Sequence, residues 1–579
     1  MEELLSRESR VRALTLAMLI GLGAIIVRLF FIQIISHQKY VVMAEEEQIK
    51  KLVIPARRGT IYAMDGLISS PLVMNEIVYT MFIDPEIVIS SDDIKTTLKE
   101  TASENIIELS KMDKKFDKST GSRYQVLAIN LNRQQAEHIK AKKFRGVGFQ
   151  AVTKRVYPEG ALAAQLLGFV NSNGGQYGVE GGLNKRLTGL DGMLESVTDI
   201  AEVPLTIGDK NVNIPAQDGD DLVLSIDKNI QYQVEKILQA KAIENGADYV
   251  SAIVIDPNDG RVRAMANYPS YNPSEFYKVT DAALFNNRVA MSPYEPGSII
   301  KAFTVGMGLD KGLITPSSTY NNTDVVQVGD RKIYNALKGH TGIVTMQQAL
   351  RYSLNTGMVD ILSRAGGGQI NRQARDQLYN YFYNVFGLGK KTGIEIPEAV
   401  GLIISPDKIE GNAVRYANMT FGQGMNLTML QVAAGFSSLI NGGNYYQPTV
   451  LAGQIKNGQF VKSEAILARS DIISSATSNT IRQMLAQARA DGAYSRLDPK
   501  GFEIAGKTGT SETLRDGVYV KDETIASYLG YGGGERPEYV IMTQISGKGK
   551  NMEGSIHAVP IFNEISDWLV KYLKIEPKG

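Results

Sequence analysis

The chain contains no cysteine among its 579 residues, and this absence removes several kinds of chemistry at once. Thiol nucleophiles, disulfides, thiolate metal sites and iron–sulfur clusters all need cysteine. Histidine is also scarce. The chain has four histidines, which lie far apart in the sequence, and no HExxH pattern occurs. A zinc site or a histidine-based catalytic triad is therefore not expected, and we predict neither a metal nor a cofactor.

An excess of charge of one sign is missing as well. The chain has 62 basic and 61 acidic residues, which leaves a net charge of +1. Because a protein that attracts nucleic acid by its overall field needs a basic surplus, nucleic acid is not an expected partner. Hydrophobic residues make up 43% of the chain and charged residues 21%, as is ordinary for a folded globular protein. At roughly 150 residues per domain, the length predicts three or four domains.

One long apolar run is present near the N-terminus. Residues 13–35 read ALTLAMLIGLGAIIVRLFFIQII. As a helix this run spans about 35 Å, enough to cross a bilayer. Three arginines lie within residues 1–12, so the positive-inside rule predicts a cytoplasmic tail there and an extracytoplasmic remainder of the chain. Arg28 lies in the second half of the run and is expected either to snorkel to the interface or to contact another membrane protein.

Residues 36–215 show no convergent set of catalytic side chains. Residues 52–62 are typical of a strand interrupted at Pro55, residues 93–110 of a helix, and residues 111–122 of a charged loop. We interpret this segment as an elongated, mostly non-catalytic pedestal.

Residues 216–579 have a different sequence pattern, with apolar segments typical of buried strands at both ends and helical segments between them. The expected strands are 221–227, 249–255, 261–267, 524–531 and 538–546, and the expected helices include 229–242 and 559–573. This pattern predicts one α/β domain whose sheet joins its two termini.

The sequence YEPGSIIKAFTV at residues 294–305 carries a candidate nucleophile. Pro296 and Gly297 mark a turn, and the helix that follows is apolar on almost every side, which predicts that it is buried. Ser298 lies at its start, and Lys301 lies one turn further along the same face. Because burial lowers the pKa of a lysine, a neutral amine could take the serine proton. The helix N-terminus adds a positive field that favours the developing anion.

Ser-x-x-Lys alone is a weak signal, since an N-cap serine followed by an exposed lysine also satisfies it. Two further motifs strengthen the prediction of a nucleophilic serine. They are Ser353-Leu-Asn355 and Lys507-Thr-Gly-Thr510. The three motifs stand in this order within residues 216–579, with gaps of 55 and 154 residues between Ser298, Ser353 and Lys507. The same combination occurs in penicillin-binding proteins and class A β-lactamases.

On these motifs the chain resembles a class B penicillin-binding protein. RVYP at residues 155–158 and GVEGGL at 178–183 resemble the family's pedestal signatures, and MANYPSYNP at 265–273, FGQG at 421–424 and HAVPIF at 557–562 resemble its transpeptidase domain. The resemblance implies a penicillin-binding, serine β-lactamase-like domain, with an antiparallel sheet flanked by helices, on an α+β pedestal behind a single transmembrane helix.

Four positions depart from the family pattern. These are the pair Ala63-Met64, counted as one, where the family usually has Asp-Arg, Ile299 where threonine is common, Ala302 where proline is frequent, and Leu354, which is unusually apolar for the centre of Ser-x-Asn. None of these changes removes a reacting group.

The resemblance also implies a role for each motif residue. Ser298 would attack the carbonyl of the penultimate D-alanine of a peptidoglycan stem peptide and form an acyl-enzyme, with Lys301 as the base. Ser353 would pass a proton to the leaving D-alanine. Asn355 would orient the substrate amide and Lys301, and Lys507 would supply positive field.

The remaining implied roles concern substrate binding. Thr508 and Thr510, with Gly509 between them, would bind the terminal carboxylate. The backbone N–H groups of Ser298 and Thr510 would form the oxyanion hole, worth roughly 3 kcal/mol per donor. An amine of a neighbouring stem peptide would then resolve the acyl-enzyme, and β-lactam antibiotics should acylate the same serine.

The expected partners and place follow from the family as well. The resemblance implies a multi-span glycosyltransferase and divisome or elongasome proteins as partners, with the division (septal) type favoured over the elongation type. The catalytic domain would lie outside the cytoplasmic membrane.

Three alternatives remain open at this point. Residues 501–508 match the P-loop pattern G-x4-G-K-[ST], although Phe502 and Ile504 would lie inside the loop and argue against a nucleotide site. A hydrolase, either a D,D-carboxypeptidase or a β-lactamase, would use the same residues as a transpeptidase. A non-catalytic β-lactam sensor or scaffold would keep the fold, but the intact motif residues count against it.

Overall fold

The computed structural model describes residues 2–40, 43, 49–66, 68–197, 212–492, 498–515 and 517–578. Its internal contacts divide the chain into two units, Met1–Arg58 with Thr188–Gly219 and Gly59–Leu187 with Asp220–Gly579. The boundary expected near residue 215, between a pedestal and a transpeptidase domain, stays a prediction, because the second unit takes in parts of both segments.

The first unit begins with one long helix. Helix α1 (Glu2–Phe30) continues into a short π-helical segment, η1 (Phe31–Ile35). Residues 10–35 have a mean hydropathy of 2.4 over their most apolar window, and their side chains lie outside any protein core. By length and composition this helix can cross a membrane, as the sequence predicts.

The same unit contains a small antiparallel sheet in the order β1-β8-β9, with β1 at Ile49–Ile54, β8 at Gly192–Val197 and β9 at Val212–Ile214. The strand expected over residues 52–62 is therefore two strands. β1 ends before Pro55, and β2 (Ile61–Asp65) begins a different sheet in the second unit. Proline has no N–H to donate to a ladder, which explains the break.

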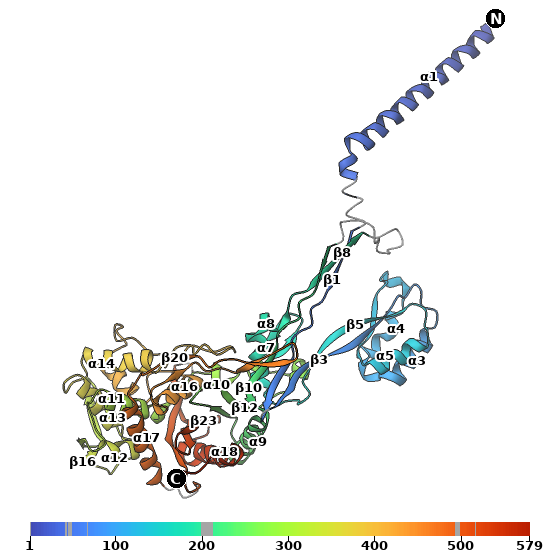
Figure 1. Ribbon diagram of the computed structural model, residues 1–579. Coiled ribbons are helices and arrows are strands. Elements are labelled where there is room, and N and C mark those ends of the chain that lie inside the picture. The colour runs from blue at the N-terminus through green and yellow to red at the C-terminus, as the bar shows by residue number, and fades with distance from the viewer. Residues whose placement is uncertain are drawn as a thin grey trace. The chain divides into compact units, whose positions relative to one another are not determined.

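The second unit is built on a five-stranded antiparallel sheet (Figure 1). Its order is β12 (Val262–Tyr268), β11 (Tyr249–Ile255), β23 (Pro537–Ser546), β22 (Val518–Gly533) and β21 (Glu503–Arg515). The sheet thus joins strands from both ends of residues 249–546, and this confirms the predicted antiparallel sheet. The strand expected at 221–227 forms as well, but it lies in a second sheet, where it pairs with other strands.

The two faces of this sheet are covered by different helices, and β11 shows why. Val250 and Val254 point into a core with α9 (Lys228–Asn245) and α18 (Val559–Tyr572), whereas Ile253 points into the larger core on the other face. Because successive side chains of a strand point to opposite faces, an all-apolar strand must be covered on both. Figure 1 shows α9 and α18 together below the sheet.

The larger core surrounds α11 (Lys301–Asp310), with α13 (Asn355–Ala365), α16 (Met429–Ile440) and α17 (Ser475–Ala490). Eight of the ten residues of α11 are buried, and so is every residue of α16. A helix that is apolar on all sides is stable only inside a protein, which confirms the burial predicted for the segment after Ser298.

A second sheet of seven strands has the order β19-β18-β10-β2-β3-β4, with β5 paired to β3. Its strands are β19 (Gln459–Lys462), β18 (Leu451–Lys456), β10 (Asp221–Asp227), β2, β3 (Ile68–Ile83), β4 (Gln125–Leu131) and β5 (Val147–Val156). β10 lies next to β2 in parallel and next to β18 in antiparallel orientation.

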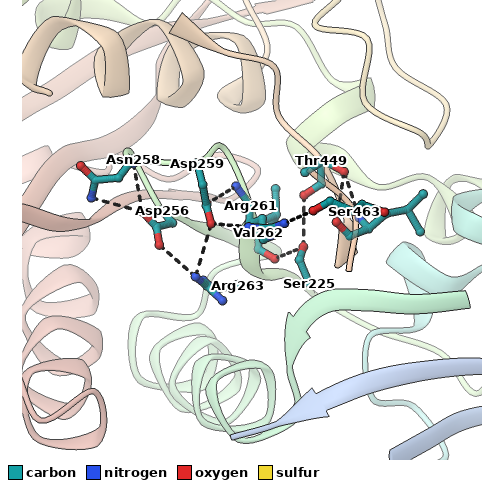
Figure 2. A network of polar contacts seen from close by, with 10 residues as sticks. Ser225, Asp256, Asn258, Asp259, Arg261, Val262, Arg263, Thr449 and Ser463 are labelled. Atoms are coloured by element: carbon teal, nitrogen blue, oxygen red, sulfur yellow. Dashed lines mark hydrogen bonds and ion pairs between the residues drawn. The ribbon is translucent and has the colours of Figure 1, made fainter. Parts of the chain in front are cut away.

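Buried polar contacts tie the start of β12 to this second sheet (Figure 2). The Ser225 hydroxyl donates to the Val262 carbonyl at 2.7 Å and to the Thr449 carbonyl at 3.1 Å. The Arg261 guanidinium pairs with Asp259 at 2.7 Å and donates to the Ser463 carbonyl. Because the Ser225 hydroxyl and the Arg261 guanidinium both have partners, these buried polar groups stabilise the contact between the two sheets.

The far part of β3, β4 and β5 forms a smaller α+β lobe with α3 (Ser91–Ala102) and α5 (Arg133–Ala141). The helix expected over residues 93–110 ends earlier, at Ala102, and turns into the 3-10 segment η2 (Ser103–Asn105). The Asn105 amide donates to the carbonyls of Ile129 and Asn130, so it bonds across to the strand instead of continuing the helix. The charged loop expected at 111–122 contains a short α-helix, α4 (Met112–Lys115), and a 3-10 turn, η4 (Lys118–Thr120).

Candidate active site

The candidate nucleophile stands on a tight turn before α11. A 3-10 segment, η7 (Gly297–Ile300), runs directly into the helix, so Ser298 lies at the helix start, as expected. Gly297 has a φ of +64°, and its N–H donates to the Gly422 carbonyl at 3.0 Å. A Cβ atom at position 297 would lie 2.6 Å from the Thr510 carbonyl oxygen, so both the backbone conformation and the close approach require glycine here.

Lys301 is fully buried on the first turn of α11. Its Nζ donates to the Ser353 carbonyl at 2.5 Å and to the Ser353 hydroxyl at 3.0 Å. Burial, and then the nearby charge of Lys507, hold the pKa of Lys301 well below its ordinary value. Among the described residues, the hydrogen bonds of its amine go to Ser353 and not to Ser298. An amine with a lowered pKa loses its proton more readily than an ordinary lysine, and in that form it can accept a proton from a hydroxyl.

Ser353 and Asn355 lie in the junction between α12 (Met346–Arg351) and α13. Ser353 has a φ of +56°, a left-handed conformation that is unfavourable for a residue with a side chain. The amide nitrogen of Asn355 donates to the Tyr334 carbonyl at 2.8 Å. The Asn355 side chain therefore makes this hydrogen bond with Tyr334 and not with Lys301, so the orientation of Lys301 by Asn355 stays a prediction.

Strand β21 carries the third motif. Lys507 is buried, and its Nζ donates to the carbonyl and hydroxyl oxygens of Thr508 at 3.2 and 3.3 Å. Burial lowers the pKa of Lys507 to about 8. Thr510 is exposed, and its hydroxyl oxygen accepts a hydrogen bond from the Gly554 N–H at 3.1 Å. Its own O–H remains available as a donor.

The three motifs, far apart in the sequence, converge at this place. A Cβ atom on Gly509 would lie 2.9 Å from the Pro296 carbonyl oxygen, so β21 packs directly against the turn that holds Ser298. Lys301 bonds to Ser353, and the charge of Lys507 acts on Lys301. The arrangement supplies a hydroxyl, a buried amine with a lowered pKa, a second hydroxyl and a lysine on the neighbouring strand, which suits acyl transfer.

Sequence reasoning missed one group beside the nucleophile, the Glu295 carboxylate. It accepts hydrogen bonds from the Gly424 N–H at 2.7 Å and from the Tyr519 hydroxyl at 3.0 Å, and burial raises its pKa. It therefore links the turn before Ser298 to FGQG and to the β21–β22 hairpin. The feature of the sequence that could have indicated this group is an acidic residue directly before Pro296, in the turn that precedes Ser298.

Two competing patterns are explained by the structure. Residues 503–508 of the P-loop pattern lie within β21, where Lys507 pairs with Leu529 of β22, so no phosphate-binding loop forms there. The second Lys-Thr-Gly begins at Lys391 and lies in a separate turn, in which the Thr392 and Gly393 N–H groups both donate to the Glu398 carboxylate.

Known proteins share this sequence and fold. A family model described as the penicillin binding protein transpeptidase domain matches residues 250–567, more than half of the chain, and one described as the penicillin-binding protein dimerisation domain matches residues 53–224. The chain is 26% identical over 557 residues to stage V sporulation protein D of Bacillus subtilis, covering 95% of this chain and 84% of that protein.

Two further comparisons agree. The chain is 28% identical over 570 residues to the peptidoglycan D,D-transpeptidase FtsI of Escherichia coli K12, covering 96% of this chain and 91% of that protein. The crystal structure of penicillin binding protein 2X from Streptococcus thermophilus has a TM-score of 0.71 at 20% identity, over 91% of this chain and 80% of that one, and this likeness shows the shared fold. The chain therefore belongs to the class B penicillin-binding proteins, which are peptidoglycan D,D-transpeptidases.

Proposed function

We propose that Ser298 is the nucleophile that forms the acyl-enzyme with a D-Ala-D-Ala stem peptide, with Lys301 as its base. The observation that carries this proposal is the fully buried amine of Lys301, one turn after Ser298 and bonded to Ser353. In this reaction the serine oxygen bonds to the carbonyl carbon of the penultimate D-alanine. The serine proton passes to Lys301, and the bond to the terminal D-alanine breaks.

The second hydroxyl completes the proton path. Ser353 accepts a hydrogen bond from Lys301, so a proton taken from Ser298 can pass through Lys301 and Ser353 to the nitrogen of the departing D-alanine. Asn355 binds the substrate amide. An amine of a second stem peptide then attacks the acyl-enzyme and regenerates Ser298.

The substrate carboxylate is bound by β21. The positive charge of Lys507 lies beneath the strand, and the exposed Thr510 and half-buried Thr508 present hydroxyl groups, with Gly509 keeping the strand close to the nucleophile turn. The N–H groups of Ser298 and Thr510 act as the oxyanion hole, and each such donor contributes roughly 3 kcal/mol.

The chain acts at the outer face of the cytoplasmic membrane during septal wall synthesis. The N-terminal helix supports membrane anchoring, and the arginines before it support a cytoplasmic N-terminus. Stem peptides are its substrates and β-lactams its inhibitors, and a multi-span glycosyltransferase of the division machinery is its partner.

Transfer of the peptidyl group from the donor peptide to an added amine tests the proposed transpeptidase activity. Full-length protein in detergent, incubated with a D-Ala-D-Ala pentapeptide and an amino-acid amide as acceptor, is expected to form the new amide and release D-alanine, as seen by mass spectrometry. Peptide acid without any amide product at high acceptor concentration would identify a hydrolase instead. Absence of both products, with acylation by penicillin retained, would identify a sensor.

The pH dependence of acylation should report the two lysines. Lys301 must be uncharged, so the rate rises as pH rises through its lowered pKa, whereas Lys507 must be charged, so the rate falls as pH rises through about 8. We expect a bell-shaped profile of the penicillin acylation rate, with its alkaline limb near pH 8. Arginine stays protonated, so Lys507→Arg should move that limb to higher pH. Circular dichroism at pH 9 controls for unfolding, and an unchanged limb in this variant would contradict the assignment.

A further inference from the structure

A polar cluster, buried except for the half-buried Asp324, lies directly behind the junction that holds Ser353 and Asn355. Its members are Asn322, Asp324, Asn335 and Thr356, which we call the asparagine clamp. Thr356 is the second residue of α13, and Asn335 follows the hairpin of β14 (Val325–Val328) and β15 (Arg331–Tyr334). Asn322 and Asn335 are 0% and 2% exposed, and buried amides are retained only where their hydrogen bonds are satisfied.

Asn335 bonds to the junction from behind. Its carbonyl oxygen accepts a hydrogen bond from the Thr356 N–H at 3.0 Å and from the Thr356 hydroxyl at 3.2 Å. The Thr356 hydroxyl also lies 2.9 Å from the Asn322 carbonyl oxygen and 3.0 Å from the Tyr320 hydroxyl. The backbone immediately after Asn355 is therefore fixed by contacts with residues on one strand, β13 (Thr319–Asn322), and in the loop after β15.

The direction of the Asn335 amide is itself fixed. Its nitrogen donates to the Asn322 oxygen at 3.0 Å and to one oxygen of Asp324 at 3.1 Å, which leaves its own oxygen for Thr356. The other oxygen of Asp324 accepts from the Gly339 N–H at 2.9 Å. A fully satisfied network of this kind specifies one arrangement. If the Asn335 amide were flipped, its N–H groups would face the N–H and hydroxyl donors of Thr356.

The clamp acts on the reacting groups through the chain between them. Thr356 is covalently next to Asn355, whose amide is held by the carbonyl of Tyr334, the residue before Asn335. Ser353, two residues before Asn355, has a left-handed backbone and contacts Lys301 through both its carbonyl and its hydroxyl. Such a strained residue keeps its conformation only where its surroundings determine it.

We infer that the asparagine clamp positions Ser353 and Asn355 for acyl transfer, with Asn335 and Thr356 as positioning residues that do not touch the substrate. This inference rests on the proposed roles of Ser298, Ser353 and Asn355. It assigns the hairpin β14–β15 to the catalytic machinery of the second unit.

The test separates positioning from fold support by comparing Asn335→Ala, Thr356→Val and Thr356→Ser in the full-length protein. For each variant, the acylation rate constant and the apparent dissociation constant for a fluorescent penicillin are measured separately, with the Tm alongside. We expect Asn335→Ala and Thr356→Val to lower the acylation rate constant about 10- to 100-fold, with dissociation constants changed by less than about threefold. Thr356→Ser keeps the hydroxyl and should restore the rate.

The control is Asn321→Ala, which removes an exposed asparagine from the strand that carries Asn322 and should acylate like the unaltered protein. If Asn335→Ala fails to fold, the Thr356→Val and Thr356→Ser pair decides the question. Rates within twofold of the unaltered protein, accompanied by a lower Tm, would show that the clamp supports only the fold. Loss of labelling at residue 298 in the unaltered protein would instead overturn the proposed function.

Discussion

Replacing Ser298 by alanine is expected to abolish covalent labelling of the full-length protein by fluorescent penicillin. The hydroxyl oxygen forms the bond to the acyl group, and no other group at this position can replace it. We expect the acylation rate to fall on the order of 10⁴-fold or more. In-gel fluorescence measures the loss, and mass spectrometry of a digest of the unaltered protein should locate the adduct on the peptide that contains residue 298.

Ser405 offers a matched control, because Ser405 and Lys408 repeat the Ser-x-x-Lys spacing. Ser405 donates to the Asp407 carboxylate at 3.0 Å, and Lys408 is exposed. Ser405→Ala should therefore label like the unaltered protein. An adduct on any peptide without residue 298, or undiminished labelling of Ser298→Ala, would show that the motif spacing is a coincidence.

The sequence predicts best those elements whose side-chain period is strong. Helix α9 covers the expected residues 229–242, and β11 covers residues 249–255 as expected. The burial of α11 also follows from its composition, since an all-round apolar helix has no stable exposed state. The pKa of Lys301 is lowered for the same reason, so the chemistry of the base could be predicted together with the fold.

Other features depend on contacts that no local pattern encodes. Helix α3 ends at Ala102 because Asn105 finds carbonyl partners on β4, and the predicted period gave no sign of that strand. Asn355 bonds to Tyr334, and Glu295 bonds to Tyr519, because two hairpins fold back onto the site from elsewhere in the chain. The order of the three motifs predicted the candidate site, but the contacts between them required the packing of β21 against Gly297.

Lys301→Met is the second change with a large expected effect, and it should separate activity from stability. Methionine fills nearly the same buried volume but cannot accept a proton, so the acylation rate should fall about 10²- to 10⁴-fold. The stability of the folded protein should instead increase. The unfolded chain protonates Lys301 more readily than the folded chain does, so the unaltered protein loses stability as pH falls. The variant should therefore gain most in Tm at low pH, which differential scanning fluorimetry at pH 6 and pH 9 can measure.

Lys301→Arg supplies the contrasting case, because arginine stays charged and cannot act as a base. It should lose acylation as Lys301→Met does, but it should also lower the Tm, since a guanidinium would stand where Lys301 is completely enclosed. If Lys301→Met acylated within about tenfold of the unaltered protein, general-base catalysis by Lys301 would be excluded. If both variants lost stability equally, the buried amine would not be uncharged, and the proton path from Ser298 to Ser353 would need another acceptor.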